Sequence, residues 1–208
     1  MAWSMAFLID ADNIRAEMIA SPVPEFAKVT DSIIIHFTHG YTVNEGCEFA
    51  KPTLGGYFGG HVEVEIDSFF YGHTNVAMPV HIFENNAVKN GRFEILSYQQ
   101  WLFETEGDMM TSIVIPINRV QEGKLDSLIR VYTAESPYDY AFFGQRCTSF
   151  MACFLSKAGV LNKISESDAI KAFFYPRPLR YTLLEYAEKN HLEVRVTKGS
   201  SCRTWEGD

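Results

Sequence analysis

The chain has 208 residues, of which 47% are hydrophobic and 21% charged, and its formal net charge is -8. This length and composition favour one well-buried domain over residues 1–208 and exclude an intrinsically disordered chain. No run of Lys and Arg supplies the basic face that nucleic acid or an anionic membrane surface requires, so neither partner is expected. The charge balance suits an uncharged or cationic substrate better.

The first half of the chain predicts an N-terminal helix followed mainly by strands. Residues 5–20 have a weak helical pattern, and the β-branched run 32–37 predicts a buried strand. After the glycine-rich segment 55–60, residues 61–66 alternate apolar and polar side chains, as a half-buried strand does. Asp67-Ser68 is a plausible turn that makes 61–72 a hairpin. Further strands are expected at 80–83, 93–96 and 112–117.

The second half is mainly helical, with expected helices at 125–134, 147–158, 165–173 and 179–190 and a last strand at 192–197. Gly159 is a good C-terminal stop for the helix 147–158. Strands in the middle and helices later predict an α+β domain, in which an antiparallel sheet packs against helices. No stretch of about 18 apolar residues is present, so no integral membrane segment is expected.

Cys147 lies in the first turn of the predicted helix 147–158, one turn before an apolar stripe that should bury against the sheet. The free N–H groups and the dipole of a helix N-terminus stabilise a thiolate, and Arg146 adds to that effect. Such a nucleophile needs a base, and His61 begins a strand directly after two glycines, which leave room beside its ring. His73 lies twelve residues further on, where strand pairing can bring the two histidines side by side.

Each of these residues also has a purely structural interpretation. A Cys that faces inward on an amphipathic helix is usually a small core residue, and Cys153 is expected to be one. Cys47 and Cys202 lie in polar, loop-like segments and have no expected role, so a reducing compartment is the simpler interpretation.

A metal site has little support in the sequence. His36 and His39 would share a helix face at their spacing, but in the predicted strand their side chains point to opposite sides. No metal ion and no cofactor are therefore expected.

Two segments carry a family resemblance. GGHVEVEID…YGH and, much later, YDYAFFGQRCTSFMACFLSKAGV resemble the permuted branch of the papain-like NlpC-type superfamily. That branch includes relatives of lecithin retinol acyltransferase and bacterial permuted peptidases. In it the catalytic His opens a strand and the catalytic Cys opens a later helix, which His61 and Cys147 match. The resemblance covers roughly 33–160 and implies a papain-like fold, with 161–208 as a C-terminal extension.

The chain also departs from the family pattern. Val62 and Glu63 stand where a small residue commonly follows the His, and Gln145-Arg146 replaces the usual Asn before the Cys. These departures concern the substrate class more than the fold.

The resemblance leaves the third catalytic residue open. Acyltransferase relatives carry a second His about twelve residues after the first, and His73 matches it. Other members use a Glu or another polar residue near that strand, so Glu63 and Glu65 stay candidates, although both are most simply the solvated face of a strand.

The remaining expected site residues concern the oxyanion and the cleft. The backbone N–H of Cys147 and the side chain of Gln145 are expected to stabilise the oxyanion. His39 and Tyr140 are expected to line the cleft.

The implied function is a thiol hydrolase that cleaves a peptide or isopeptide amide through an acyl-enzyme on Cys147, with His61 as base. Its partner would be a peptide-like or acyl substrate. Alternatives are an acyl-lipid transferase or esterase using the same site, a non-catalytic binding module, and a metallohydrolase. The N-terminus lacks a basic segment before its apolar run, so we expect a cytoplasmic protein, with export by a removed signal peptide as the alternative.

Overall fold

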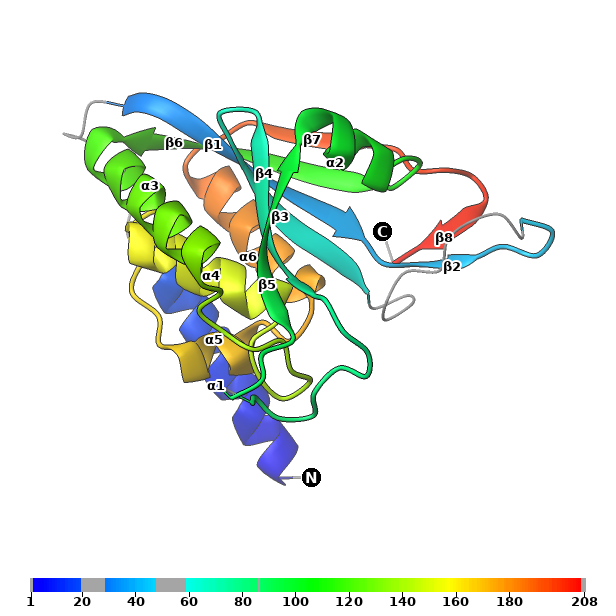
Figure 1. Cartoon of the computed structure of the whole chain (residues 1–208), viewed down its shortest axis with the longest axis horizontal. Coiled ribbons are helices and arrows are strands. Elements are labelled where there is room, and N and C mark those ends of the chain that lie inside the picture. The colour runs from blue at the N-terminus through cyan, green and yellow to red at the C-terminus, as the bar shows by residue number, and fades with distance from the viewer. Residues whose placement is uncertain (1, 20–28, 48–58, 86, 207–208) are drawn as a thin grey trace.

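The computed structural model describes residues 2–19, 29–47, 59–85 and 87–206, and the fold is α+β (Figure 1). The expected class is confirmed: an antiparallel sheet packs against a layer of helices. No helix in the described ranges is long and apolar enough to cross a bilayer.

The main sheet has six strands in the order β5-β4-β3-β1-β6-β7, and every neighbouring pair is antiparallel. Its strands are β1 (Val29–His39), β3 (Gly60–Ile66), β4 (Phe69–Asn75), β5 (Gly91–Ser97), β6 (Met110–Asn118) and β7 (Val194–Thr197). A separate two-stranded ribbon pairs β2 (Tyr41–Val43) with β8 (Arg203–Trp205).

Helices cover both faces of the sheet unequally. The described helices are α1 (Ala2–Met18), α2 (Tyr98–Glu104), α3 (Arg119–Ala134), α4 (Cys147–Ala158), α5 (Glu166–Ala172) and α6 (Pro176–Lys189). Helices α3, α4 and α6 pack on one face, and α4 also contacts α5, so α4 is buried on nearly every side. The short α2 lies on the other face (Figure 1).

Strand alternation divides the buried residues between the two faces. Ile33, Ile35 and Phe37 of β1 are fully buried and belong to the main core with α4. Phe70 faces the other way and stacks on Trp101 of α2, with ring centroids 4.2 Å apart. The residues between the core positions of β1 and β3 therefore lie under α2, which places His36, Glu63 and Glu65 on that second face.

The hairpin predicted from 61–72 is present and continues to Asn75. Asp67 and Ser68 both have positive φ, 52° and 64°, as a two-residue hairpin turn of the primed type requires. The ladder between β3 and β4 covers only 64–66 with 69–71, although each strand has seven residues. Beyond that ladder, residues 60–63 of β3 pair with β1 only.

Helix α4 has the predicted bounds and ends at Gly159, which is left-handed with φ of 76°. The predicted strand at 80–83 is wrong, since the segment forms only an isolated bridge between His81 and Ala141. Neither α2 nor the β2–β8 ribbon was predicted, because short elements carry too few periods of a pattern. Of the predicted glycine-rich segment, 55–58 lie outside the described residues.

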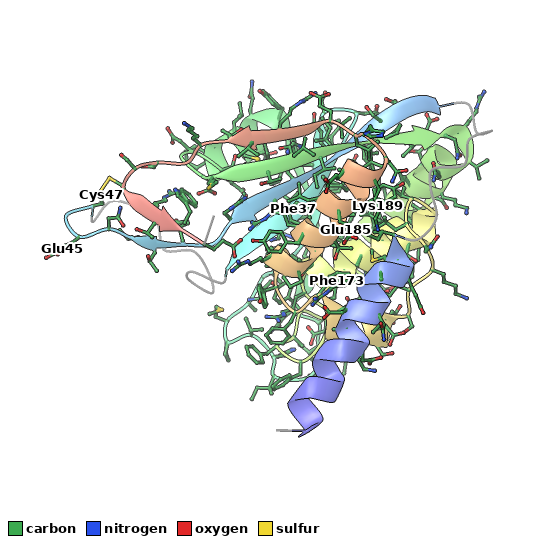
Figure 2. The ribbon with its side chains drawn as sticks, turned by 180° about the vertical axis from the view of Figure 1, so that it is seen from behind. Phe37, Glu45, Cys47, Phe173, Glu185 and Lys189 are labelled. Carbon is green, nitrogen blue, oxygen red and sulfur yellow. A yellow bond between two sulfur atoms is a disulfide. The ribbon has the colours of Figure 1, made fainter. Side chains whose placement is uncertain are left out.

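Cys47 and Cys202, for which no role was expected, form a disulfide with Cα atoms 5.5 Å apart. Figure 2 shows Cys47 at the far tip of the β2–β8 ribbon. The two cysteines are separated by 155 residues, so their proximity depends on the whole fold and not on local spacing. A buried ion pair between Arg180 and Glu206, 2.6 Å long, fastens the last described residues to α6.

Candidate active site

His61 is positioned by the glycine that precedes it. Gly60 has a φ of 91°, and a Cβ there would clash with the carbonyl oxygen of Thr38 on β1. Only glycine therefore allows β3 to begin so close to β1. His61 is the next residue, at the end of β3 that has no ladder with β4.

Cys147 is the first residue of α4 and is 5% exposed. Its side chain lies close enough to the side chain of His61 for each group to shift the pKa of the other. The structure therefore brings together a helix N-terminal thiol and an imidazole from a strand that lies far away in the sequence.

The two groups change each other's acidity. Burial by itself lowers the pKa of His61, but the hydrogen bond and the charge of Cys147 outweigh it and raise that pKa to about 9. Burial by itself raises the pKa of Cys147, but the hydrogen bond and charge of His61, with the charge of Arg146, lower it below its ordinary value. Both shifts favour the thiolate–imidazolium form of the pair over the neutral form.

Tyr140 and Arg146 complete the surroundings of the sulfur. Tyr140 lies beside Cys147, and burial together with the charge of Cys147 raises the pKa of its hydroxyl. Arg146 lies over the ring of Phe174, 3.5 Å from its centroid, and this stacking holds its charge beside the thiolate.

Glu63 lies two residues after His61 on the same face of β3 and is 6% exposed. The indole N–H of Trp101 donates to its Oε2 over 2.7 Å. Burial raises the pKa of Glu63, whereas the charge of His61 lowers it, and its own charge helps to raise the pKa of His61. Among the expected third residues, Glu63 is the one that the structure places beside His61 and in the same cavity.

Gly72 of β4 lies directly beside the side chains of His61 and Glu63. A Cβ at this position would lie 3.2 Å from Nε2 of His61 and 3.3 Å from Cγ of Glu63. The imidazole of His61 and the side-chain methylene of Glu63 therefore occupy the space that a side chain at residue 72 would need.

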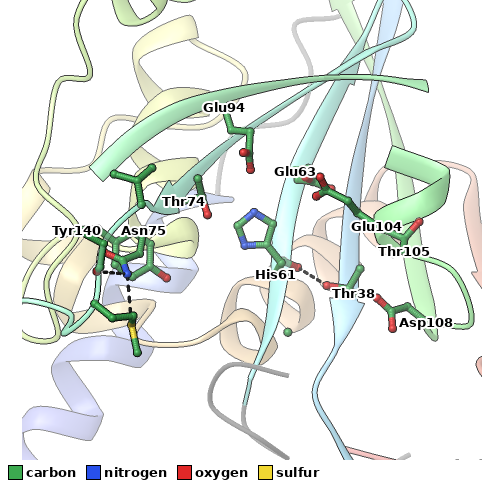
Figure 3. A pocket seen from close by; sticks show the side chains of 14 residues that line it. Thr38, His61, Glu63, Thr74, Asn75, Glu94, Glu104, Thr105, Asp108 and Tyr140 are labelled. Atoms are coloured by element: carbon green, nitrogen blue, oxygen red, sulfur yellow. Dashed lines mark hydrogen bonds between the residues drawn. The ribbon is translucent and has the colours of Figure 1, made fainter. Parts of the chain in front are cut away.

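Two cavities meet at the Cys147–His61 pair and share Gly60 and Tyr140 in their walls. The first, of about 490 Å³, contains His61 and four carboxylates (Figure 3). These are Glu63, Glu94, Glu104 and Asp108. The second, of about 230 Å³, contains Cys147 and Arg146 among largely apolar and aromatic neighbours, which include Phe142 and Phe174.

His73 does not reach His61. The register pairs Val64 with Tyr71, so continuing it places His73 level with Val62 and on the core face, one residue out of step with His61. His73 is fully buried between Tyr140 and Phe150, with ring centroids 5.5 and 4.9 Å away. Burial lowers its pKa to about 4.

The ring nitrogens of His73 lie beside backbone of Asp139 and Arg92 without well-formed hydrogen bonds. A neutral ring in this position supports Tyr140 by stacking and takes no direct part in orienting His61.

Glu65, the other expected carboxylate, is engaged elsewhere. Its Oε2 lies 3.0 Å from Nε2 of His36, and Nδ1 of His36 lies 2.8 Å from the hydroxyl of Ser112. The ring of His36 packs on Trp101 at 4.8 Å. This polar chain stabilises the sheet face under α2, and it turns the Glu65 carboxylate away from His61.

Gln145 and His39 also lie away from the reacting groups. The side-chain amide of Gln145 points to the sulfur of Cys153, 3.9 Å away, and its backbone N–H donates to Glu84 over 2.8 Å. His39 shares the core face of β1, and its Nε2 lies 2.8 Å from the hydroxyl of Thr111. Of the three residues expected near the oxyanion or cleft, the structure brings only Tyr140 to Cys147.

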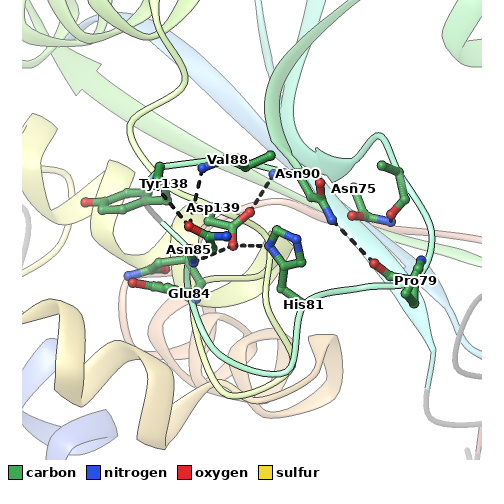
Figure 4. Close-up of polar contacts among 12 residues, drawn as sticks. Asn75, Pro79, His81, Glu84, Asn85, Val88, Asn90, Tyr138 and Asp139 are labelled. Carbon is green, nitrogen blue, oxygen red and sulfur yellow. Dashed lines mark hydrogen bonds and ion pairs between the residues drawn. The ribbon is translucent and has the colours of Figure 1, made fainter.

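A cluster around Asp139 holds the segments 76–85 and 87–90 against the entry to α4 (Figure 4). Asp139 is fully buried and accepts the backbone N–H groups of Asn85 and Asn90 over 2.8 and 2.5 Å, while Nδ1 of His81 lies 2.6 Å away. Burial would raise the pKa of Asp139, but these hydrogen bonds lower it. The loop supplies Met78 and Val80 to the two cavities, so this cluster shapes the site although nothing in the sequence pattern indicated it.

Metal binding finds no support in the described ranges, where no three His, Cys, Asp or Glu side chains come together as ligands would. His36 and His39 lie on opposite faces of β1, each with a hydroxyl partner. No protein-family model, no curated protein and no solved structure matches this chain, so its function has to be inferred from the site itself.

Proposed function

We propose that this protein is a thiol hydrolase that cleaves an amide bond through an acyl-enzyme on Cys147. The observation that carries the proposal is the neighbouring Cys147–His61 pair, at the N-terminus of α4, where two cavities meet. A buried thiol whose pKa is lowered by an adjacent imidazole is the arrangement that nucleophilic catalysis by cysteine requires.

Acylation uses the charges of this pair. The Cys147 thiolate attacks the carbonyl carbon, a C–S bond forms, and the carbonyl oxygen becomes an oxyanion. As the oxyanion collapses, the C–N bond breaks and the imidazolium of His61 gives its proton to the departing nitrogen. The products of this step are a thioester on Cys147, a free amine and a neutral His61.

Deacylation reverses the roles. Neutral His61 takes a proton from water, whose oxygen attacks the thioester carbonyl. The C–S bond then breaks, which releases a carboxylic acid and restores the thiolate–imidazolium pair. Glu63, held by Trp101, positions the ring and favours its charged form through both steps.

The oxyanion is best placed beside the backbone N–H of Cys147. The Tyr140 hydroxyl, which lies beside Cys147, is our candidate for the second donor. In other enzymes, removing one such donor costs about 3–4 kcal/mol of transition-state stabilisation.

A second candidate, an acyl-lipid transferase or esterase at the same site, is favoured by one surface feature. Phe83 and Phe143 are 70% and 56% exposed and stack with centroids 5.7 Å apart. Phe142 links them to Phe174 in the wall of the Cys147 cavity, at 5.3 Å from the latter. An apolar rim of this kind fits a long acyl chain entering from a lipid surface.

The test is the pH dependence of alkylation of Cys147 by iodoacetamide, read by peptide mass mapping in the wild type and in His61→Ala. The internal control is Cys153, a free and buried thiol whose pKa burial raises to about 11. Wild-type Cys147 should react well below the ordinary thiol pKa, and His61→Ala should move its reactivity toward that of an ordinary thiol.

Equal reactivity in wild type and variant, or a Cys147 as inert as Cys153, would contradict the proposal and leave a non-catalytic binding module as the better description. If the pair is present, hydrolysis of peptide amides and of phospholipid acyl esters should then be compared, with Cys147→Ala as the blank.

A further inference from the structure

Arg146 is the one cation among the described residues that line the cavity at Cys147, and none of those residues is a carboxylate. The Cζ atom of its guanidinium lies 3.5 Å from the ring centroid of Phe174 and 5.4 Å from that of Phe142. Its Nη2 atom is shielded from solvent and has no hydrogen-bond acceptor among the described residues. A charged donor buried in this way is destabilising unless an acceptor reaches it at some stage of function.

The backbone of Arg146 is fixed at the start of α4. Its N–H donates to Oγ of Ser149 over 2.9 Å, and its carbonyl accepts the N–H of Phe150 over 2.9 Å. Arg146 is the N-cap residue and Cys147 is the first residue of the helix, so the guanidinium and the thiol belong to the same helical turn. The charge of Arg146 acts on both Cys147 and Tyr140. The cation therefore lies near the nucleophile and near the candidate oxyanion donor beside it.

A cation beside a thiolate stabilises the enzyme before the reaction as well as during it. Lowering the pKa of a thiol makes the thiolate more abundant but also makes it a weaker nucleophile. An interaction accelerates the chemical step only if it is stronger in the transition state than in the ground state. During attack the negative charge leaves the sulfur and develops on the carbonyl oxygen of the substrate. The cation therefore assists the attack only if it also reaches that oxygen.

We propose that Arg146 is a catalytic residue whose Nη2–H donates to the oxyanion, beside the backbone N–H of Cys147. This inference rests on the thiol-hydrolase function proposed above, and it adds a charged donor to the neutral hydroxyl of Tyr140. No proton moves to or from Arg146, because a guanidinium stays protonated throughout. Its buried nitrogen has no acceptor among the described residues of the free enzyme, and it gains one in the tetrahedral intermediates.

The acyl-enzyme separates the two roles of this cation. Once Cys147 carries a thioester, its sulfur has no charge, and the described lining of the cavity then holds no anion for Arg146. The attack of water on the thioester creates a second oxyanion, to which Nη2 donates again. An arginine that only stabilises the thiolate serves acylation and the final release of the sulfur, whereas an oxyanion donor also assists the attack of water.

The experiment compares two electrophiles on the same thiolate in the wild type and in Arg146→Met. Iodoacetamide alkylates Cys147 by direct displacement of iodide, so no oxyanion forms. The p-nitrophenyl ester of hydrocinnamic acid acylates Cys147 through an oxyanion, and its p-nitrophenolate departs without a proton from His61. Both rate constants are read on the plateau of their pH profiles, where Cys147 is fully a thiolate. A change in the pKa of Cys147 therefore does not enter the comparison.

Arg146→Met should change alkylation by no more than about twofold and lower acylation by about 10²–10³-fold, the loss expected for one oxyanion donor. Hydrolysis of the acyl-enzyme, read from the steady state after the p-nitrophenolate burst, should slow by at least about tenfold for the same reason. Arg146→Lys keeps the charge but loses the planar fork, so acylation should still fall by at least about tenfold while alkylation holds. The matched control Arg130→Met, at an exposed arginine on α3, should leave all three rates unchanged.

The outcomes separate the two proposals. If p-nitrophenolate release is the same in Cys147→Ala, the hydrolase function itself fails. If release depends on Cys147 but Arg146→Met slows alkylation and acylation by the same factor, the hydrolase stands and Arg146 serves the thiolate alone. Unchanged hydrolysis of the acyl-enzyme would likewise overturn the oxyanion role. If urea denaturation shows that Arg146→Met is not folded, Arg146→Lys decides, since a wild-type ratio of acylation to alkylation in that variant would exclude a role for Nη2.

Discussion

Replacement of Gly72 by Ala tests the geometry of the candidate site without touching a polar group. The backbone at Gly72 does not have the left-handed conformation that only glycine adopts easily, so alanine is compatible with the strand. The added methyl would lie 3.2 Å from Nε2 of His61 and 3.3 Å from Cγ of Glu63, both inside ordinary van der Waals contact. Both side chains must therefore move by a few tenths of an ångström.

The expected effect on stability is small, because two contributions oppose each other. Alanine allows the unfolded chain fewer backbone conformations than glycine does, which stabilises the folded state by roughly 0.4–1 kcal/mol. Overpacking of a filled site costs about 1–3 kcal/mol. A net loss of about 1–2 kcal/mol leaves most of the stability of a typical domain.

The expected effect on reactivity is larger. A misplacement of about 1 Å in a catalytic group can cost 10²-fold, so a few tenths of an ångström should cost roughly tenfold. The rate of Cys147 alkylation at neutral pH should fall by about that factor in Gly72→Ala, and its apparent pKa should rise, because the ring that stabilises the thiolate has moved.

The matched control is Gly123→Ala in α3, where an added Cβ meets nothing within 4 Å. It should raise the free energy of unfolding by about 0.5–1 kcal/mol and leave Cys147 reactivity unchanged. Urea denaturation and alkylation kinetics measure both quantities in both variants. A Gly72→Ala protein that is folded and reacts like Gly123→Ala would refute the placement of His61 over Gly72.

Three further results are expected. The rate of hydrolysis should fall above about pH 9, where His61 loses the proton that the leaving group needs, and at acid pH, where the Cys147 thiolate is protonated. Because folding raises the pKa of His61 from 6.5 to about 9, the contribution of His61 to stability is complete below pH 6.5 and is lost as the pH rises through about 9. Urea titrations across that pH range would detect the loss. Trp101→Phe removes the hydrogen-bond donor to the buried side chain of Glu63. The free energy of unfolding, measured by urea denaturation, should fall by about 1–3 kcal/mol. Thiol titration of the denatured, unreduced chain should find two free thiols and four after reduction, and reduction of the Cys47–Cys202 disulfide should cost roughly 3–5 kcal/mol of stability in the same urea assay.

The parts of the site that could be predicted are those with a local signal. Cys147 is the first residue of an amphipathic helix that ends at a glycine, and His61 begins an alternating strand after two glycines. Each pattern can be recognised within one short segment of the sequence. The order of strands and helices was likewise enough to predict the α+β class, which the structure confirms.

The remaining parts depend on relations that no short segment contains. Whether His73 or Glu63 accompanies His61 depends on the register of a two-residue turn, since a slip of one residue exchanges the faces of the strand. Trp101, which holds Glu63, comes from a seven-residue helix with no clear pattern of its own. The role of Asp139 is visible only in the folded chain, where it accepts the backbone N–H groups of Asn85 and Asn90.

The distance in sequence between β3 and α4 has a consequence for how the protein is made. His61 is synthesised well before Cys147, and no local contact joins them; they meet only when α4 docks on a sheet that is itself built from distant strands. On a nascent or misfolded chain Cys147 is an ordinary thiol, mostly protonated at neutral pH. A Cys147 thiolate therefore requires that β3 and α4 have come together, so its reactivity measures the fraction of molecules in which the site is assembled.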